Sequence, residues 1–172
     1  MKKIVRNSQG PRMPIDKILV PVDFSACSDA ALAYALSMAD ECGAQVEVLH
    51  VWSPRDREGR ASTIFADTPE GIAMERALSA AESDHAARIC GRLEFGEEPS
   101  SVILDILERE RFDLVVVGRG GRSKDQGGHV SAHLEREAPC KVVALPIVKA
   151  DPNRSFVDTF IAKRTAGGFD AG

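Results

Sequence analysis

The chain has 172 residues, of which 44% are hydrophobic and 28% charged, an ordinary composition for one globular domain. Its formal charge of −4, from 22 basic and 26 acidic residues, argues against a general nucleic-acid or membrane-surface binder. No apolar run approaches the roughly eighteen residues that a membrane span needs, and residues 1–14 lack the apolar segment of a signal peptide. We therefore expect a cytoplasmic protein that binds neither nucleic acid nor membranes.

The first half of the chain predicts two strands with a helix between them. Residues 17–22, KILVPV, are a short aliphatic run typical of a buried parallel strand. Ser25 is a suitable N-cap for the helix that follows, and Gly43 is a suitable terminator. Residues 46–51 predict the second strand. The polar stretch 53–69 predicts a long connection, and its charged part is placed where it could cover a crevice.

The second half continues this alternation of helices and strands. Pro69 opens a helix that is predicted to run from about Glu70 to Cys90. The remaining elements are a strand at 92–95, a helix at 99–109, a strand at 113–117, a helix at 129–137 and a strand at 141–148. Alternating strands and helices favour parallel pairing with right-handed crossovers, so we predict one doubly wound α/β domain.

The domain is predicted to cover residues 15–148, between an N-terminal arm at 1–14 and a tail at 149–172. In the tail, Asp151 as N-cap and Pro152 after it indicate a short helix with one apolar face. Packing of this helix on its own domain and docking across a dimer both remain open.

Four stretches together resemble the universal stress protein family. They are KILVPVDFS (17–25), VEVLHV (46–51), FGEEPSSVILDILERERFDLVVVGRGG (95–121) and GGHVSAHLEREAPCKVVALPI (127–147). The resemblance implies a five-stranded parallel sheet of order 3-2-1-4-5, with a ligand crevice where the first and fourth strands end. It also implies a homodimer in which strand 141–148, at the edge of the sheet, pairs with a second copy.

The ligand implied by the resemblance is ATP or another adenine nucleotide. Asp23 would accept hydrogen bonds from the adenine amino group or a ribose hydroxyl, above an apolar floor of Pro21, Val22 and Val51. Glycines permit backbone N–H groups to approach phosphate oxygens, and a helix N-terminus favours an anion. The residues expected at the phosphates are Gly118, Arg119, Gly121, Arg122, Gly128, His129 and Val130.

The glycine-rich loop departs from the pattern of the nucleotide-binding members. Those members carry Gly-x2-Gly, nine residues, and then Gly followed by Ser or Thr. Here six residues, 122–127, separate Gly121 from Gly128, and His129 stands in place of the hydroxyl. A shortened loop that still wraps phosphate, with His129 or Arg122 replacing the hydroxyl, and a loop that has lost this function both remain open.

Other reactive side chains have simpler interpretations. His129, His133 and Glu137 share a helix face at a spacing that suits a metal, but no further ligand set accompanies them, so we predict no metal site. Cys27, near the N-cap, is expected to be a small buried thiol. His50 is expected to be a hydrogen-bonded core residue, and His85 to be solvated.

The sequence carries no GxSxG, Walker lysine motif or paired catalytic carboxylates. We therefore predict a dimeric binding or signalling module rather than an enzyme. The alternatives are an interaction dimer that binds no nucleotide and a slow ATP-hydrolysing enzyme.

Overall fold

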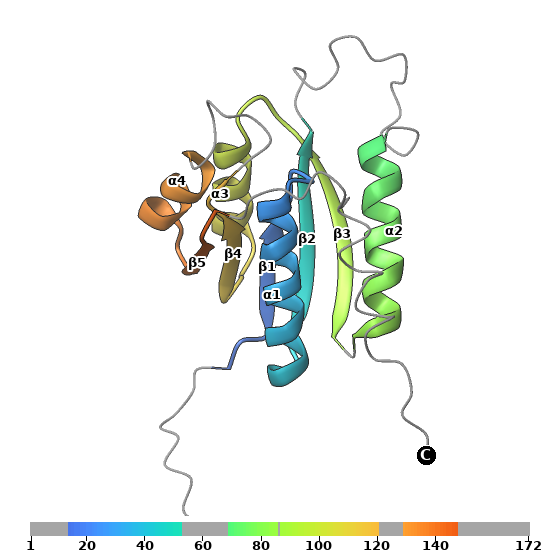
Figure 1. The fold of residues 1–172 in the computed structure, drawn as a ribbon. Helices are drawn as coiled ribbons and strands as arrows, with labels where there is room; N and C mark the ends of the chain where they lie inside the picture. The colour runs from blue at the N-terminus through green and yellow to red at the C-terminus, as the bar shows by residue number, and fades with distance from the viewer. Residues whose placement is uncertain (1–13, 53–68, 86, 121–128, 148–172) are drawn as a thin grey trace, which may run out of the picture.

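The computed structural model of the chain describes residues 14–52, 69–85, 87–120 and 129–147 (Figure 1). Nearly all of the N-terminal arm, the connection at 53–68 and the tail at 149–172 lie outside the described residues. So does most of the glycine-rich loop, at 121–128. The predictions made for these segments stay predictions.

Five strands form one parallel sheet in the order β3-β2-β1-β4-β5, as the resemblance implied. The strands are β1 (Lys17–Pro21), β2 (Gln45–Trp52), β3 (Arg88–Phe95), β4 (Leu114–Gly118) and β5 (Lys141–Leu145). Their residues are strongly aliphatic because both faces of such a sheet are covered. The predicted fold class is confirmed.

Four helices cover the two faces of this sheet within the described residues (Figure 1). They are α1 (Ala26–Cys42), α2 (Pro69–Asp84), α3 (Pro99–Arg109) and α4 (His129–Glu137). One core cluster joins α1 and α2 to the even-numbered residues of the central strands, such as Ile18 and Val116. The other joins α3 and α4 to odd-numbered residues such as Leu19 and Val115, because successive side chains of a strand point to opposite faces.

Helix α1 begins and ends as the sequence predicts. The Ser25 side chain accepts a hydrogen bond from the backbone of Ser28, whose side chain bonds back to Ser25 in a capping box. Gly43, with φ of 77°, occupies the left-handed region at the end of the helix and donates its N–H to Ala39 O.

Several predicted boundaries are wrong. Helix α2 ends at Asp84 rather than near Cys90, and β3 begins at Arg88 rather than Arg92. The reason is that β2, itself longer than predicted, offers Gln45–Val48 as partners for Arg88–Gly91. Strand β5 ends at Leu145 rather than 148, because its partner β4 ends at Gly118, which pairs with Leu145.

Candidate functional site

The order in which the chain adds strands to the sheet reverses between β1 and β4, which is the topological switch point. From β1 the chain winds through β2 to β3 on one side, and then crosses to β4 and β5 on the other. Strand β1 pairs with β2 along five residues, whereas its register with β4 covers Ile18↔Leu114 and Leu19↔Val115. In open α/β sheets, ligands bind outside the carboxyl ends of the strands at such a switch point.

Asp23 lies in the short connection between the end of β1 and the N-cap of α1. Its Oδ1 accepts hydrogen bonds from Ser25 N at 3.1 Å and from the Ser25 hydroxyl at 2.6 Å. These bonds hold the half-buried carboxylate beside the N-terminus of α1, where the helix dipole favours a negative charge. The side chain is therefore oriented before any ligand arrives.

The backbone between Asp23 and Ser25 makes an unusual turn. Phe24 has a φ of 61°, a conformation that costs a bulky residue of order 1–3 kcal/mol. Its ring lies 4.7 Å from the His50 ring, and His50 Nδ1 donates a hydrogen bond to Val22 O at 2.8 Å. His50 is thus a hydrogen-bonded core histidine, as expected. No sequence pattern predicted the Phe24 geometry, in which the ring contacts a residue of the next strand.

Gly118 ends β4 in direct contact with the first turn of α1. A Cβ at Gly118 would lie 2.6 Å from the Cys27 carbonyl oxygen, and one at Gly120 would lie 2.6 Å from Cys27 Sγ. These contacts bring the carboxyl end of β4 against the helix that starts at the end of β1, so the two strand ends do meet. They also give both glycines a packing role that the sequence did not reveal.

The residues predicted as an apolar floor belong to different parts of the core. Val22 belongs to the core on the α1 and α2 face, whereas Val51 belongs to the core on the α3 and α4 face. Pro21 is half-buried at the end of β1. Val22 and Val51 therefore pack on opposite faces of the sheet, and their place beside a ligand stays a prediction.

The residues predicted to contact phosphate have different surroundings, and three of them lie outside the described residues. Arg119 follows β4, but its guanidinium points to α4 and β5, where Nη2 donates to Glu135 Oε1 at 2.6 Å. His129 is exposed as the first residue of α4, and Val130 packs half-buried against the core. The predicted contacts Gly121, Arg122 and Gly128 lie outside the described residues.

His133, one of the histidines considered as a metal ligand, has another contact. His133 Nδ1 lies 2.8 Å from the buried Ser100 hydroxyl, which donates to Glu98 Oε1 at 3.3 Å. The Ser100–His133 bond links the start of α3 to α4. Across the described residues, no three His, Cys, Asp or Glu side chains are grouped to hold a metal ion.

One histidine differs from expectation, whereas Cys27 does not. His85 is not simply solvated, because its Nδ1 lies 2.5 Å from Asp40 Oδ2 and so connects the end of α2 to α1. Cys27 is buried, as expected, but Cys42 is exposed at the end of α1. All four cysteines are free thiols.

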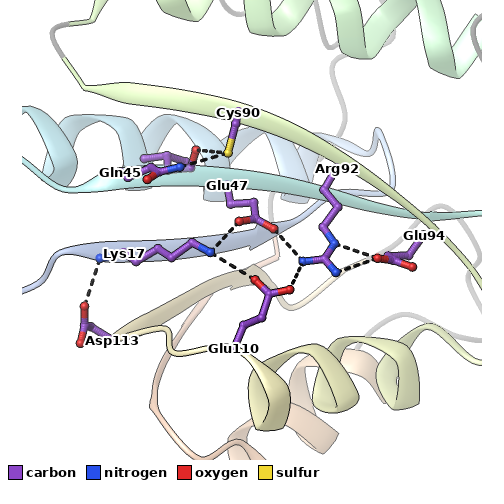
Figure 2. A network of polar contacts seen from close by, with 9 residues as sticks. Lys17, Gln45, Glu47, Cys90, Arg92, Glu94, Glu110 and Asp113 are labelled. Atoms are coloured by element: carbon purple, nitrogen blue, oxygen red, sulfur yellow. Dashed lines mark hydrogen bonds and ion pairs between the residues drawn. The ribbon is translucent and has the colours of Figure 1, made fainter.

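An ion-pair network that sequence patterns did not predict runs from Lys17, at the start of β1, to Glu94, near the end of β3 (Figure 2). Glu47 of β2 accepts hydrogen bonds from Lys17 Nζ at 2.9 Å and from Arg92 Nη1 at 3.2 Å. Glu110, at the end of α3, contacts the same two cations, and Arg92 also pairs with Glu94. A glutamate within the aliphatic run VEVLHV was the available signal.

The network shifts the titration of its members. Hydrogen bonds from Arg92 and then Lys17 lower the pKa of Glu110, although burial acts in the opposite direction. Burial opposes the Lys17 ammonium, but its bonds to Glu47 and Glu110 raise its pKa above 10.5. The bond to Glu110 likewise raises the pKa of Arg92. Their ion pairs connect β1, β2, β3 and the end of α3.

Comparisons with known proteins agree with this geometry. The sequence profile described as the universal stress protein family matches residues 14–146. The universal stress protein UspA from Lactobacillus plantarum is 22% identical, with a TM-score of 0.65 over 78% of this chain and 99% of its own. A universal stress protein in complex with cAMP is 23% identical, with a TM-score of 0.62 over 77% of this chain and 97% of its own.

A third solved structure is more similar in sequence. The universal stress protein from Archaeoglobus fulgidus in complex with dAMP is 25% identical, with a TM-score of 0.52 over 77% of this chain and 98% of its own. No curated protein is a significant match to the sequence.

The fold defines a doubly wound α/β protein whose strand order reverses between β1 and β4. The family profile covers most of the chain and specifies the class further. The chain belongs to the universal stress protein family. None of the helices in the described part of the chain has the length and hydropathy that crossing a bilayer requires.

Proposed function

We propose that this protein binds an adenine nucleotide in the crevice between the ends of β1 and β4, and acts as a dimeric binding module in a stress response. Asp23 would accept a hydrogen bond from the adenine amino group or a ribose hydroxyl. The N-terminus of α4 at His129 and Val130, with Gly118, Gly121, Arg122 and Gly128, would receive the phosphates.

The observation that carries this proposal is the fixed position of the Asp23 carboxylate beside the meeting point of β1 and β4. Two bonds from Ser25 orient it, and Gly118 packs directly on the helix that Ser25 caps. An acceptor held in advance loses little conformational freedom when a ligand binds. Structures of universal stress proteins in complex with cAMP and dAMP support an adenine ligand in this fold.

Nucleotide binding is tested by denaturing the purified protein, identifying released small molecules by mass spectrometry, and titrating ATP in a calorimeter. We expect Asp23→Asn, which keeps an oxygen but loses the charge, to weaken ATP binding about tenfold or more. Asp105→Asn, an exposed substitution on α3, is the matched control and should bind as the unchanged protein does. Neither released nucleotide nor heat on ATP addition would end the proposal.

The proposed module is not an enzyme, and Asp23 serves as a ligand contact. Steady ATP turnover that disappears in Asp23→Ala would instead establish the slow hydrolase. Dimerisation is proposed to occur through antiparallel pairing of β5, an edge strand, with a second copy. Light scattering at micromolar concentration is expected to give the mass of two chains, and a monomer mass under all conditions would reject it.

A second candidate function is an interaction dimer without nucleotide. The observation that favours it is the engagement of Arg119, a predicted phosphate contact, with Glu135. The same calorimetric titration separates the two candidates, because the interaction dimer would give no heat with ATP.

A further inference from the structure

One hydrogen bond shows which backbone groups of β5 face away from β4. Arg119 N donates to Leu145 O at 2.9 Å, so the backbone groups of Leu145 face β4. Backbone groups alternate sides along a strand, and those of Val142, Ala144 and Pro146 therefore face outward. Pro146 has no N–H, which leaves the outward groups of Val142 and Ala144 as the main pairing positions for a second strand.

The Arg119 side chain reaches this outward side. Its Nε donates to Ala144 O at 3.4 Å, while Nη2 is held by Glu135 Oε1 at 2.6 Å. A pairing strand would lie only about 4.7–4.9 Å from β5, in the space that a guanidinium on the Ala144 carbonyl occupies. An added strand must therefore displace Arg119 from the edge.

Arg119 also lies next in the chain to the proposed nucleotide site. Its backbone directly follows Gly118, whose Cα packs on the first turn of α1. The pair with Glu135 is half-exposed on both sides, and ion pairs of this kind are weak. A phosphate group binds a guanidinium through two parallel charged hydrogen bonds, a stronger interaction than an exposed carboxylate contact.

We propose that Arg119 couples the crevice to the β5 edge by occupying one of two positions. On Glu135 and Ala144 O it opposes pairing of β5 with a second copy of the chain, a partial block that weakens the dimer. On the phosphate of a bound nucleotide it leaves the edge open. This coupling depends on the proposed nucleotide binding, whereas the block itself needs only the described contacts. The nucleotide then acts as a ligand that favours the dimer.

The block is tested without nucleotide, by measuring the dimer dissociation constant in sedimentation equilibrium. Each dimer contains two copies of the Arg119 contact, so Arg119→Ala is expected to lower the constant about tenfold. Arg136→Ala removes a neighbouring exposed charge, paired with Glu137, and should leave the constant unchanged. A constant for Arg119→Ala equal to that of the unchanged protein, or equally lowered in Arg136→Ala, overturns the block.

The coupling is tested by repeating the measurement with saturating ATP. ATP should lower the dimer dissociation constant of the unchanged protein and have no such effect on Arg119→Ala. Glu135→Gln, which loosens only the Glu135 contact, should give an intermediate constant and keep the response to ATP. Calorimetric binding of ATP without any change in dimerisation overturns the coupling. Absence of ATP binding overturns the proposed function and the coupling together, and leaves the result on the block standing.

Discussion

Glu47 offers the sharpest test of how the fold is held together. Its side chain is 8% exposed and contacts Lys17 and Arg92, whose side chains are 27% and 25% exposed. The change Glu47→Gln preserves shape and removes the charge, so two partly buried cations lose one of their carboxylates. Breaking a fully buried ion pair costs about 3–5 kcal/mol.

The expected loss is smaller here, because both cations keep Glu110 and a partial water shell. We expect the free energy of unfolding at neutral pH to fall by about 2–3 kcal/mol. For a chain of this size that corresponds to a melting temperature lower by about 4–12 °C. Urea denaturation followed by circular dichroism measures the change, provided that the dependence on urea concentration is unaltered.

Glu94→Gln is the matched control. Glu94 contacts the same Arg92 from the same face of the sheet, but its side chain is 33% exposed. An exposed pair contributes about 0–1 kcal/mol, so this variant should lose far less stability. Equal losses for the two variants, or a loss below about 1 kcal/mol for Glu47→Gln, would refute the argument from burial.

Three further predictions follow from contacts already described. The Arg92 hydrogen bond lowers the pKa of Glu110 in the folded state, so the stabilisation from ionised Glu110 is complete above about pH 4.5 and is lost on further acidification. Glu110→Gln should therefore flatten the fall in unfolding free energy between about pH 5 and 3. An unchanged fall would contradict this. Iodoacetamide with mass spectrometry should label exposed Cys42 well before buried Cys27, and the reverse order would be incompatible with the fold. Gly118→Ala should lower the unfolding free energy by about 1–3 kcal/mol, and adding Cys27→Ala should not restore it, because the new methyl group meets the Cys27 backbone. Gly120→Ala should also destabilise the fold, but adding Cys27→Ala should restore the loss, because here the methyl group meets the Cys27 thiol.

Much of the fold was predictable because local signals agreed with one another. The Ser25 cap, the Gly43 terminator and the first-turn Pro99 mark helix ends through backbone chemistry that acts over a few residues. Strand β3 was harder to delimit. Its first half, Arg88–Gly91, has no strong strand pattern and is extended because β2 offers it hydrogen-bonding partners.

The candidate site was predictable in part. Asp23 follows an aliphatic strand, so its place at a carboxyl end could be derived from parallel topology. The conformation of Phe24 and the orientation of Arg119 could not be derived, because each depends on side chains from other elements. Phe24 contacts His50 of β2, and Arg119 contacts Glu135 of α4.

By itself, the sequence determined the alternation of strands and helices, the parallel sheet and the family, since these follow from hydrophobic period, caps and short motifs read along the chain. Only the tertiary structure decided that Gly118 is a packing contact for Cys27, that Glu47 joins two cations, and that Arg119 lies on the β5 edge. The physical reason is the separation along the chain of the residues that interact. Periodicity and capping depend on neighbours within a few residues, whereas steric contacts and ion pairs depend on which distant segments the fold brings within about 4 Å.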